Sequence, residues 1–287
     1  DGHPDFFAHL ARLAFSEEKV DEAWEMALRG LRRIYERSAR SSEWEDHEQD
    51  LGLLLRYLSD HLQDHPAPPE VVEALTELAG QLRVPEDHLD LGHCLRHLGE
   101  TELAREELAV GLASDIDGEN RDEGIRGLLT MQVEDFERRF VVAVDELALE
   151  PQPEHAIEEM QVFLGVQPEF WPALFFLAVG YKRLGDEDKA LDTFAEALAV
   201  SPSQPEVLFE MGELFDRRGN PKRALECVEE ALQSQPDEPK LSAAMARYCE
   251  RLGRIDEARV AIASAIELDP DSVEYQALRD RLFTNDS

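Results

Sequence analysis

Apolar residues recur three or four positions apart along most of the chain, which is the spacing of one face of an α-helix. Over residues 171–272 these helical stretches come in pairs, separated by short turns that contain Gly or Pro. Alternating apolar and polar positions, the pattern of a half-buried strand, do not occur at any useful length. The pattern therefore predicts an all-α chain that is built from helix pairs.

The same residues return every 34 positions, without insertion, in segments 176–202, 210–236 and 244–270. Small residues let two antiparallel helices approach closely, and glycine takes the positive φ that often ends a helix. Each segment carries a Gly that ends its first helix, two alanines in its second helix and a closing Pro. These are Gly185, Gly219 and Gly253; Ala190, Ala224 and Ala258; Ala197, Ala231 and Ala265; and Pro202, Pro236 and Pro270.

This pattern resembles the tetratricopeptide repeat family, whose period is also 34 residues. The resemblance is strongest over residues 171–272, and weaker copies cover 4–37, 88–116 and 137–168. It implies a right-handed superhelical solenoid of antiparallel helix pairs, with about seven pairs and a C-terminal capping helix near residues 272–283.

The chain is expected to have two parts that differ in how regular their repeats are. Residues 1–118 would hold divergent helix pairs, and residues 130–287 the regular repeats with their cap. A charged, Gly-rich run between them, over residues 115–127, predicts a loop or hinge at 119–129. The first helix of the following pair is expected to begin near Gly127 or Thr130.

The formal net charge is −34, from 63 acidic and 29 basic residues. Such a charge repels nucleic acid and anionic membranes, and it attracts basic partners. An acidic surface can also serve solubility alone. No apolar run reaches the length of a membrane span. Three cysteines without CxxC spacing favour a reducing, cytoplasmic setting, and the Arg-rich composition suggests a bacterial source. Because the first residue is Asp1, the chain is expected to be a piece of a longer protein or a processed product.

The sequence predicts no enzyme, no cofactor and no metal, because motifs for nucleophilic, zinc-dependent or nucleotide-dependent catalysis are missing. The best metal candidate is one helix in which His93 and His97 are a turn apart. The same helix also carries His88 and Cys94. His61 and His65 are a weaker candidate for a metal site. We interpret all of them as ordinary helix side chains, since closed metal sites show four dedicated ligands.

The resemblance implies that a partner lies in a concave groove lined by the first helix of each pair. At the corresponding offsets stand Val141, Asp145, Phe175, Val179, Phe209, Glu210, Glu213, Ala243 and Arg247, and further towards the N-terminus Ala8, Arg12, Leu89 and His93. An apolar strip with an acidic rim predicts a protein or peptide partner with apolar anchors and basic flanks. For Phe175 and Phe209, the alternative is that they pack between repeats.

The resemblance and the missing catalytic residues together predict a non-catalytic scaffold or adaptor that binds a partner in the groove. Two alternatives stay open: a self-assembling repeat module that forms homo-oligomers, and a recruiting arm of a longer multidomain protein that docks, for example, a small GTPase. Acids at Glu206, Glu210 and Glu213 argue against the carboxylate clamp of chaperone-binding members of the family.

Overall fold

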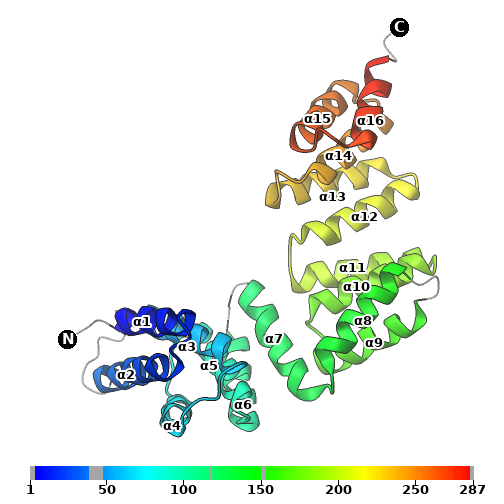
Figure 1. The fold of residues 1–287 in the computed structure, drawn as a ribbon. Helices are drawn as coiled ribbons and strands as arrows, with labels where there is room; N and C mark the ends of the chain where they lie inside the picture. The colour runs from blue at the N-terminus through cyan, green and yellow to red at the C-terminus, as the bar shows by residue number, and fades with distance from the viewer. Residues whose placement is uncertain (1–3, 39–47, 115, 117, 150–152, 285–287) are drawn as a thin grey trace. The chain divides into compact units, whose positions relative to one another are not determined.

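The computed structural model describes the chain except for residues 1–3, 39–47, 115, 117, 150–152 and 285–287. Every regular element in the described part is an α-helix, and the helices follow one another with short connections (Figure 1). The predicted all-α helical repeat fold is confirmed. Residue contacts divide the chain into two compact units, Asp1–Glu137 and Arg138–Ser287.

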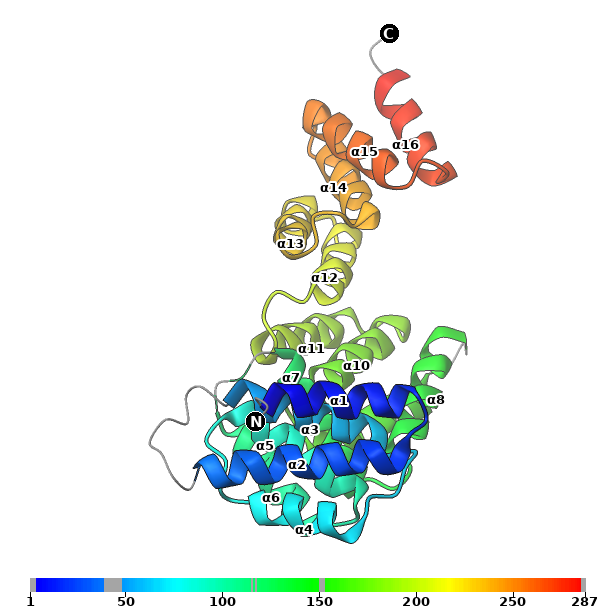
Figure 2. The same cartoon turned by 60° about the vertical axis from the view of Figure 1, so that its left-hand side comes forward.

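The N-terminal unit contains seven helices, counted over its described residues. They are α1 (Pro4–Ser16), α2 (Val20–Ser38), α3 (Glu48–Leu62), α4 (Pro69–Leu78), α5 (Pro85–His97), α6 (Thr101–Leu112) and α7 (Gly118–Gln132). The pairs α1–α2 and α5–α6 pack closely, and α3 joins them by contacting both α1 and α5 (Figure 2). Their shared core is rich in leucine, including Leu54, Leu55, Leu58, Leu91 and Leu95.

The predicted loop at residues 119–129 is wrong, because this segment is helical and forms most of α7. Its glycines were the loop signal, but Gly124 and Gly127 are buried where helices approach closely. A Cβ on Gly127 would come within 2.8 Å of the His93 ring, and one on Gly124 within 3.0 Å of Leu89. The next helix begins at Phe136, not near residue 130. The division into divergent and regular parts stays a prediction.

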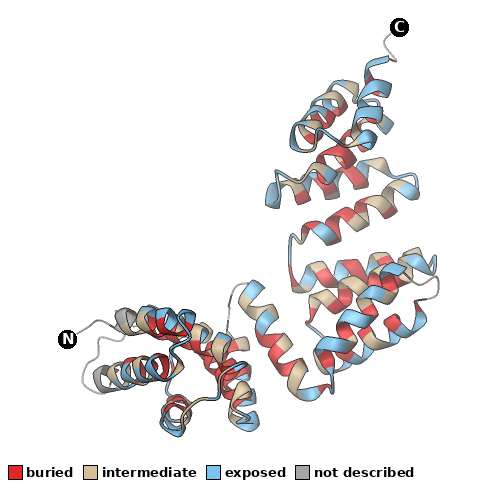
Figure 3. Cartoon of the chain, in the orientation of Figure 1, coloured by how far each residue is buried: buried red, intermediate tan, exposed pale blue. Residues whose placement is uncertain are grey.

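The C-terminal unit, Arg138–Ser287, is also helical in its described regular elements. Its helices are α8 (Phe136–Leu149), which begins at the boundary, α9 (Glu154–Val166), α10 (Trp171–Arg183), α11 (Glu187–Val200), α12 (Pro205–Arg217), α13 (Pro221–Ser234), α14 (Pro239–Arg251), α15 (Ile255–Leu268) and α16 (Val273–Thr284). The pairs α10–α11, α12–α13 and α14–α15 repeat at the predicted period. Buried residues lie on the facing sides of these helices (Figure 3).

The final helix, α16, covers the end of its own stack. Leu278 and Leu282 are buried, and α16 contacts α15 and α14. Arg281 pairs with Glu250 of α14, and the Arg259 side chain donates to the Leu282 carbonyl at 2.9 Å. The predicted capping helix is therefore confirmed. No helix in the described part of the chain has both the length and the apolar content that a membrane span needs.

Replacing glycine by alanine should change the free energy of unfolding in opposite directions at two positions, one that ends a first helix and one inside α9. Gly219 has φ +76° and open space around it, so Gly219→Ala should cost about 1 kcal/mol through backbone strain alone. Gly165 lies inside α9 and also has open space, so Gly165→Ala should stabilise by about 0.5 kcal/mol. Urea unfolding of the two variants measures both values. Equal changes in the two would contradict the role assigned to Gly219.

Candidate partner-binding face

The first helices α10, α12 and α14 present one pocket of about 270 Å³ near their N-terminal ends. Proline begins α12 and α14 and stands at the second position of α10, which suits a helix start because this residue lacks an N–H. We call this site the Phe175–Phe209 pocket. Its lining consists of Phe175, Pro205, Glu206, Phe209, Glu210, Gln235, Glu238, Lys240 and Leu241.

The two phenylalanines combine the two roles left open by the sequence. Phe209 is only 9% exposed, and the Lys240 ammonium lies 4.2 Å from its ring centre. Phe175 is half-buried, and its ring packs against Phe176 and Phe194 at centroid distances of 5.1 and 5.9 Å. Each ring therefore packs into the core while it also lines the pocket.

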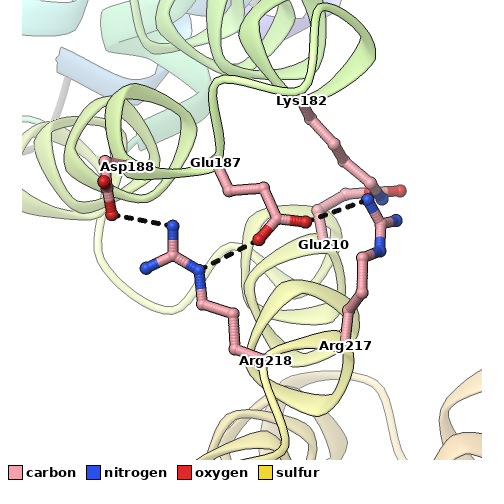
Figure 4. A network of polar contacts seen from close by, with 6 residues as sticks. All are labelled: Lys182, Glu187, Asp188, Glu210, Arg217 and Arg218. Atoms are coloured by element: carbon pink, nitrogen blue, oxygen red, sulfur yellow. Dashed lines mark hydrogen bonds and ion pairs between the residues drawn. The ribbon is translucent and has the colours of Figure 1, made fainter.

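Two members of the predicted acidic rim are paired with bases from neighbouring first helices. Glu210 of α12 forms an ion pair with Lys182 of α10 (Figure 4). Glu213 accepts hydrogen bonds from the Arg247 guanidinium at 2.9 Å and from the Tyr248 hydroxyl at 2.7 Å. Burial, followed by the hydrogen bond to Glu213, raises the pKa of Tyr248. The charge that these acids would offer to a partner is thus largely balanced within the chain.

Further ion pairs hold successive helix pairs together at one edge of this face. Glu187 of α11 lies 3.3 Å from Arg217 and 3.1 Å from Arg218, both at the end of α12 (Figure 4). Arg251 of α14 reaches Asp216 of α12 at 2.6 Å. Pairs of this kind are individually weak where they are exposed. Together they link α11, α12 and α14, which favours a constant spacing of the helices that form the pocket.

The remaining predicted groove residues do not line this pocket. Val141 and Asp145 are exposed on α8, and Val179 is partly buried against the core that α10, α11 and α12 share. Ala243 is buried, as are Ala8, Leu89 and His93 in the N-terminal unit. Of the residues predicted to line the groove, the pocket contains Phe175, Phe209 and Glu210.

The pocket also contains residues that the sequence analysis did not select. Lys240 and Glu238 stand at the start of α14, where the Glu238 carboxylate accepts a hydrogen bond from the Lys240 backbone N–H at 3.3 Å. Their signal in the sequence is their position beside Pro239, since the first turns of α12 and α14 border the pocket. The family offsets pointed to positions further along the helix.

The histidine and cysteine residues of α5 are engaged in packing. His88 Nδ1 lies 2.6 Å from Glu107 Oε2, both buried, and Cys94 Sγ donates to the Leu55 carbonyl at 3.2 Å. His61 and His65 stack on Phe15 at 4.2 and 5.9 Å. Across the described residues, no three His, Cys, Asp or Glu side chains are placed so that they could hold a metal ion.

Comparison with protein families supports the repeat assignment in the C-terminal unit. A family model described as "Tetratricopeptide repeat" matches residues 181–248 and 217–282. No curated protein matches the sequence. Many solved structures do match the fold.

Three of these structures illustrate the likeness. The Cut9–Hcn1 hetero-tetramer of APC/C is 13% identical, covers 92% of this chain and 56% of its own, and has a TM-score of 0.50. MamA from Desulfovibrio magneticus RS-1 is 16% identical, with 53% and 85% covered and a TM-score of 0.48. The tetratricopeptide protein TTC0263 from Thermus thermophilus is 21% identical, with 70% and 100% covered and a TM-score of 0.42. At these identities the likeness concerns the fold.

Proposed function

We propose that this chain is a member of the tetratricopeptide repeat family, whose model matches residues 181–248 and 217–282, and that it is a non-catalytic interaction module. It would hold a segment of a partner protein on the face formed by α10, α12 and α14. The observation that carries the proposal is the Phe175–Phe209 pocket, which combines aromatic walls with charged groups at its rim. Small pockets with an aromatic lining typically receive the anchor side chains of a bound peptide.

The pocket suits a partner segment with one apolar anchor residue. Its walls are Phe175, Phe209 and Leu241, and about 270 Å³ can hold one large side chain. The exposed carboxylate of Glu206 and the nearby Glu238 supply negative charge, while Lys240 covers the Phe209 ring. Basic groups beside the anchor would meet Glu206 and Glu238, whereas Glu210 is already paired with Lys182.

A self-assembling module is the less favoured alternative. Exchange of the terminal helix between copies would need α16 to leave its own stack, where Leu278 and Leu282 are buried. The high negative charge also opposes contact between two copies. The recruiting-arm hypothesis, including docking of a small GTPase, is compatible with the proposed pocket. We also propose a cytoplasmic, reducing setting, which is supported by the three free cysteines Cys94, Cys227 and Cys249.

Covering the pocket tests the proposed function. Glu206 is exposed at the rim, so Glu206→Trp should place a ring over the opening without disturbing the core. Glu196→Trp makes the same change on the exposed side of α11 and serves as the matched control. We expect a protein captured from cell lysate by the wild type and the control to fall at least about tenfold with Glu206→Trp, as measured by quantitative mass spectrometry.

Phe209→Glu would be a poor test, because a charge at this buried position would disturb folding. Circular dichroism should show that both tryptophan variants keep the wild-type helix content. If the same proteins bind all three forms in equal amounts, the partner does not use the Phe175–Phe209 pocket. If no protein binds the wild type, the proposal of an interaction module is contradicted.

A further inference from the structure

A second and larger pocket, of about 560 Å³, lies between the end of α13, the middle of α14 and the length of α15. We call it the α13–α15 slot. It shares no lining residue with the Phe175–Phe209 pocket. Its lining is Leu232, Pro236, Ser242, Met245, Asp256, Glu257, Val260, Ala261 and Ser264. Val260 is 72% exposed, so it gives the slot an apolar wall that faces solvent.

The slot exists because small residues replace larger ones at repeat positions. Ser242 stands where the two preceding repeats carry Leu174 and Leu208, both of which are buried packing residues. Ala261 stands where those repeats carry a threonine and a cysteine, Thr193 and Cys227. The smaller side chains leave a hollow, whereas larger side chains occupy the same positions in the two preceding repeats.

Charge has also been lost along the wall that α15 contributes. At the position of Val260 the preceding repeats carry Asp192 and Glu226. One turn later, Ser264 takes the position of two further acids, Glu196 and Glu230. In a chain of net charge −34, two neighbouring acids are thus replaced by an apolar and a neutral residue beside this hollow.

The rim at the start of α15 has the opposite charge to its counterpart in the repeat before it. Asp256 and Glu257 replace the bases Lys222 and Arg223. Arg223 packs over Phe215 at 5.5 Å, and in the third repeat Cys249 replaces that aromatic ring. Asp256 is fully exposed and lies 3.8 Å from Arg259, a long contact that leaves most of its charge facing water, and Glu257 pairs with Arg254. The slot is therefore an apolar hollow beside an acidic helix start.

We infer that the α13–α15 slot is a second docking site, which binds a segment of another protein that carries apolar residues flanked by Lys or Arg. The apolar residues fill the space between Met245, Val260 and Leu232, and the basic flank meets Asp256. A second copy of this chain does not fit this description, because its net charge of −34 opposes approach to an acidic rim.

The test begins with a phage-displayed random-peptide library that is selected on the wild type. Ser242→Leu serves for counter-selection, because it fills the slot with the residue of the two preceding repeats and leaves the charge unchanged. We expect the selected peptides to combine two or more large apolar residues with Lys or Arg. If no peptide with both features is enriched, the inference is overturned.

Affinities of one selected peptide, from fluorescence anisotropy, then locate its site. Ser242→Leu and Val260→Glu should each weaken binding at least about tenfold. Val260→Glu is decisive because it restores the acid of the preceding repeat: added negative charge alone would tighten a basic peptide, so weaker binding requires the apolar slot. Glu206→Trp, which covers the other pocket, should bind like the wild type.

The variants separate failure of this inference from failure of the proposed function. If Ser242→Leu and Val260→Glu bind the peptide as tightly as the wild type, the slot is not its site. If Glu206→Trp alone loses the peptide, the Phe175–Phe209 pocket is the site, and the proposed function stands without the slot. Because Ser242→Leu fills a hollow with a residue used elsewhere in the repeat, its melting temperature should equal or exceed that of the wild type.

Discussion

Replacing Phe194 by alanine should lower the stability of the C-terminal unit by about 3–5 kcal/mol, since this is the usual cost of removing a fully buried ring. Phe194 of α11 is inaccessible to solvent and packs with Leu174, Ala178 and Leu214. Its ring also contacts Phe175, at a centroid distance of 5.9 Å. The variant should therefore loosen the Phe175–Phe209 pocket as well as the α10–α11 pair.

Hydrogen exchange followed by mass spectrometry measures this effect where it arises. Amides of α10 and α11 should exchange faster in Phe194→Ala. Phe283→Ala is the matched control, because Phe283 is 54% exposed on α16, and removing its ring should change stability by no more than about 0.5 kcal/mol. If the amides of α10 and α11 exchange at the same rate in both variants, the ring of Phe194 does not hold this helix pair together.

The sequence predicted the repeat well, because the residues that define it are set by close packing between neighbouring helices. Ala190, Ala224 and Ala258 recur since a larger residue would separate the two helices of a pair. The prediction failed at residues 119–129, where glycine has two possible meanings. Gly124 and Gly127 allow close packing inside α7, but in a single sequence they read as a turn.

The candidate site was predictable only in part, because side-chain pairing depends on which helices meet. Phe175, Phe209 and Glu210 were found from family offsets. Lys182, which lies 28 positions before Glu210 in the chain, neutralises the charge of Glu210. This pairing depends on side-chain geometry that cannot be read from the sequence. The α13–α15 slot, in contrast, can be traced in the sequence once the structure shows which positions line it, since Ser242 and Val260 break a 34-residue pattern.

Two buried groups of α5 should give the N-terminal unit opposite pH dependences that partly cancel in the wild type. Burial raises the pKa of Asp90 from 3.8 to about 6, against the opposing influence of Arg56 at 3.5 Å. Burial lowers the pKa of His93 from 6.5 to about 4, with smaller contributions from the positive charges of Arg96 and His97. The His93 Nε2 atom is buried without a hydrogen-bond partner in the described part of the chain.

The signs follow from which state binds the proton more tightly. The folded state holds the Asp90 proton more tightly than the unfolded state, so Asp90 stabilises as the pH falls, by about 1 kcal/mol from pH 7 to pH 5. The unfolded state holds the His93 proton more tightly, so His93 destabilises over the same interval by about 2 kcal/mol. Glu123 and Asp60 act on Asp90 in the same direction as burial.

Asp90→Asn and His93→Gln should therefore separate these contributions. Between pH 7 and pH 5, His93→Gln should gain about 2 kcal/mol relative to the wild type, and Asp90→Asn should lose about 1 kcal/mol. Urea unfolding followed by tryptophan fluorescence in a Trp171→Phe background reports on the N-terminal unit, which contains the buried Trp24. Taking each variant's change between the two pH values removes the direct effect of the substitution. Equal changes in both variants and the wild type would show that neither group titrates differently on folding, and that α5 admits water to both side chains.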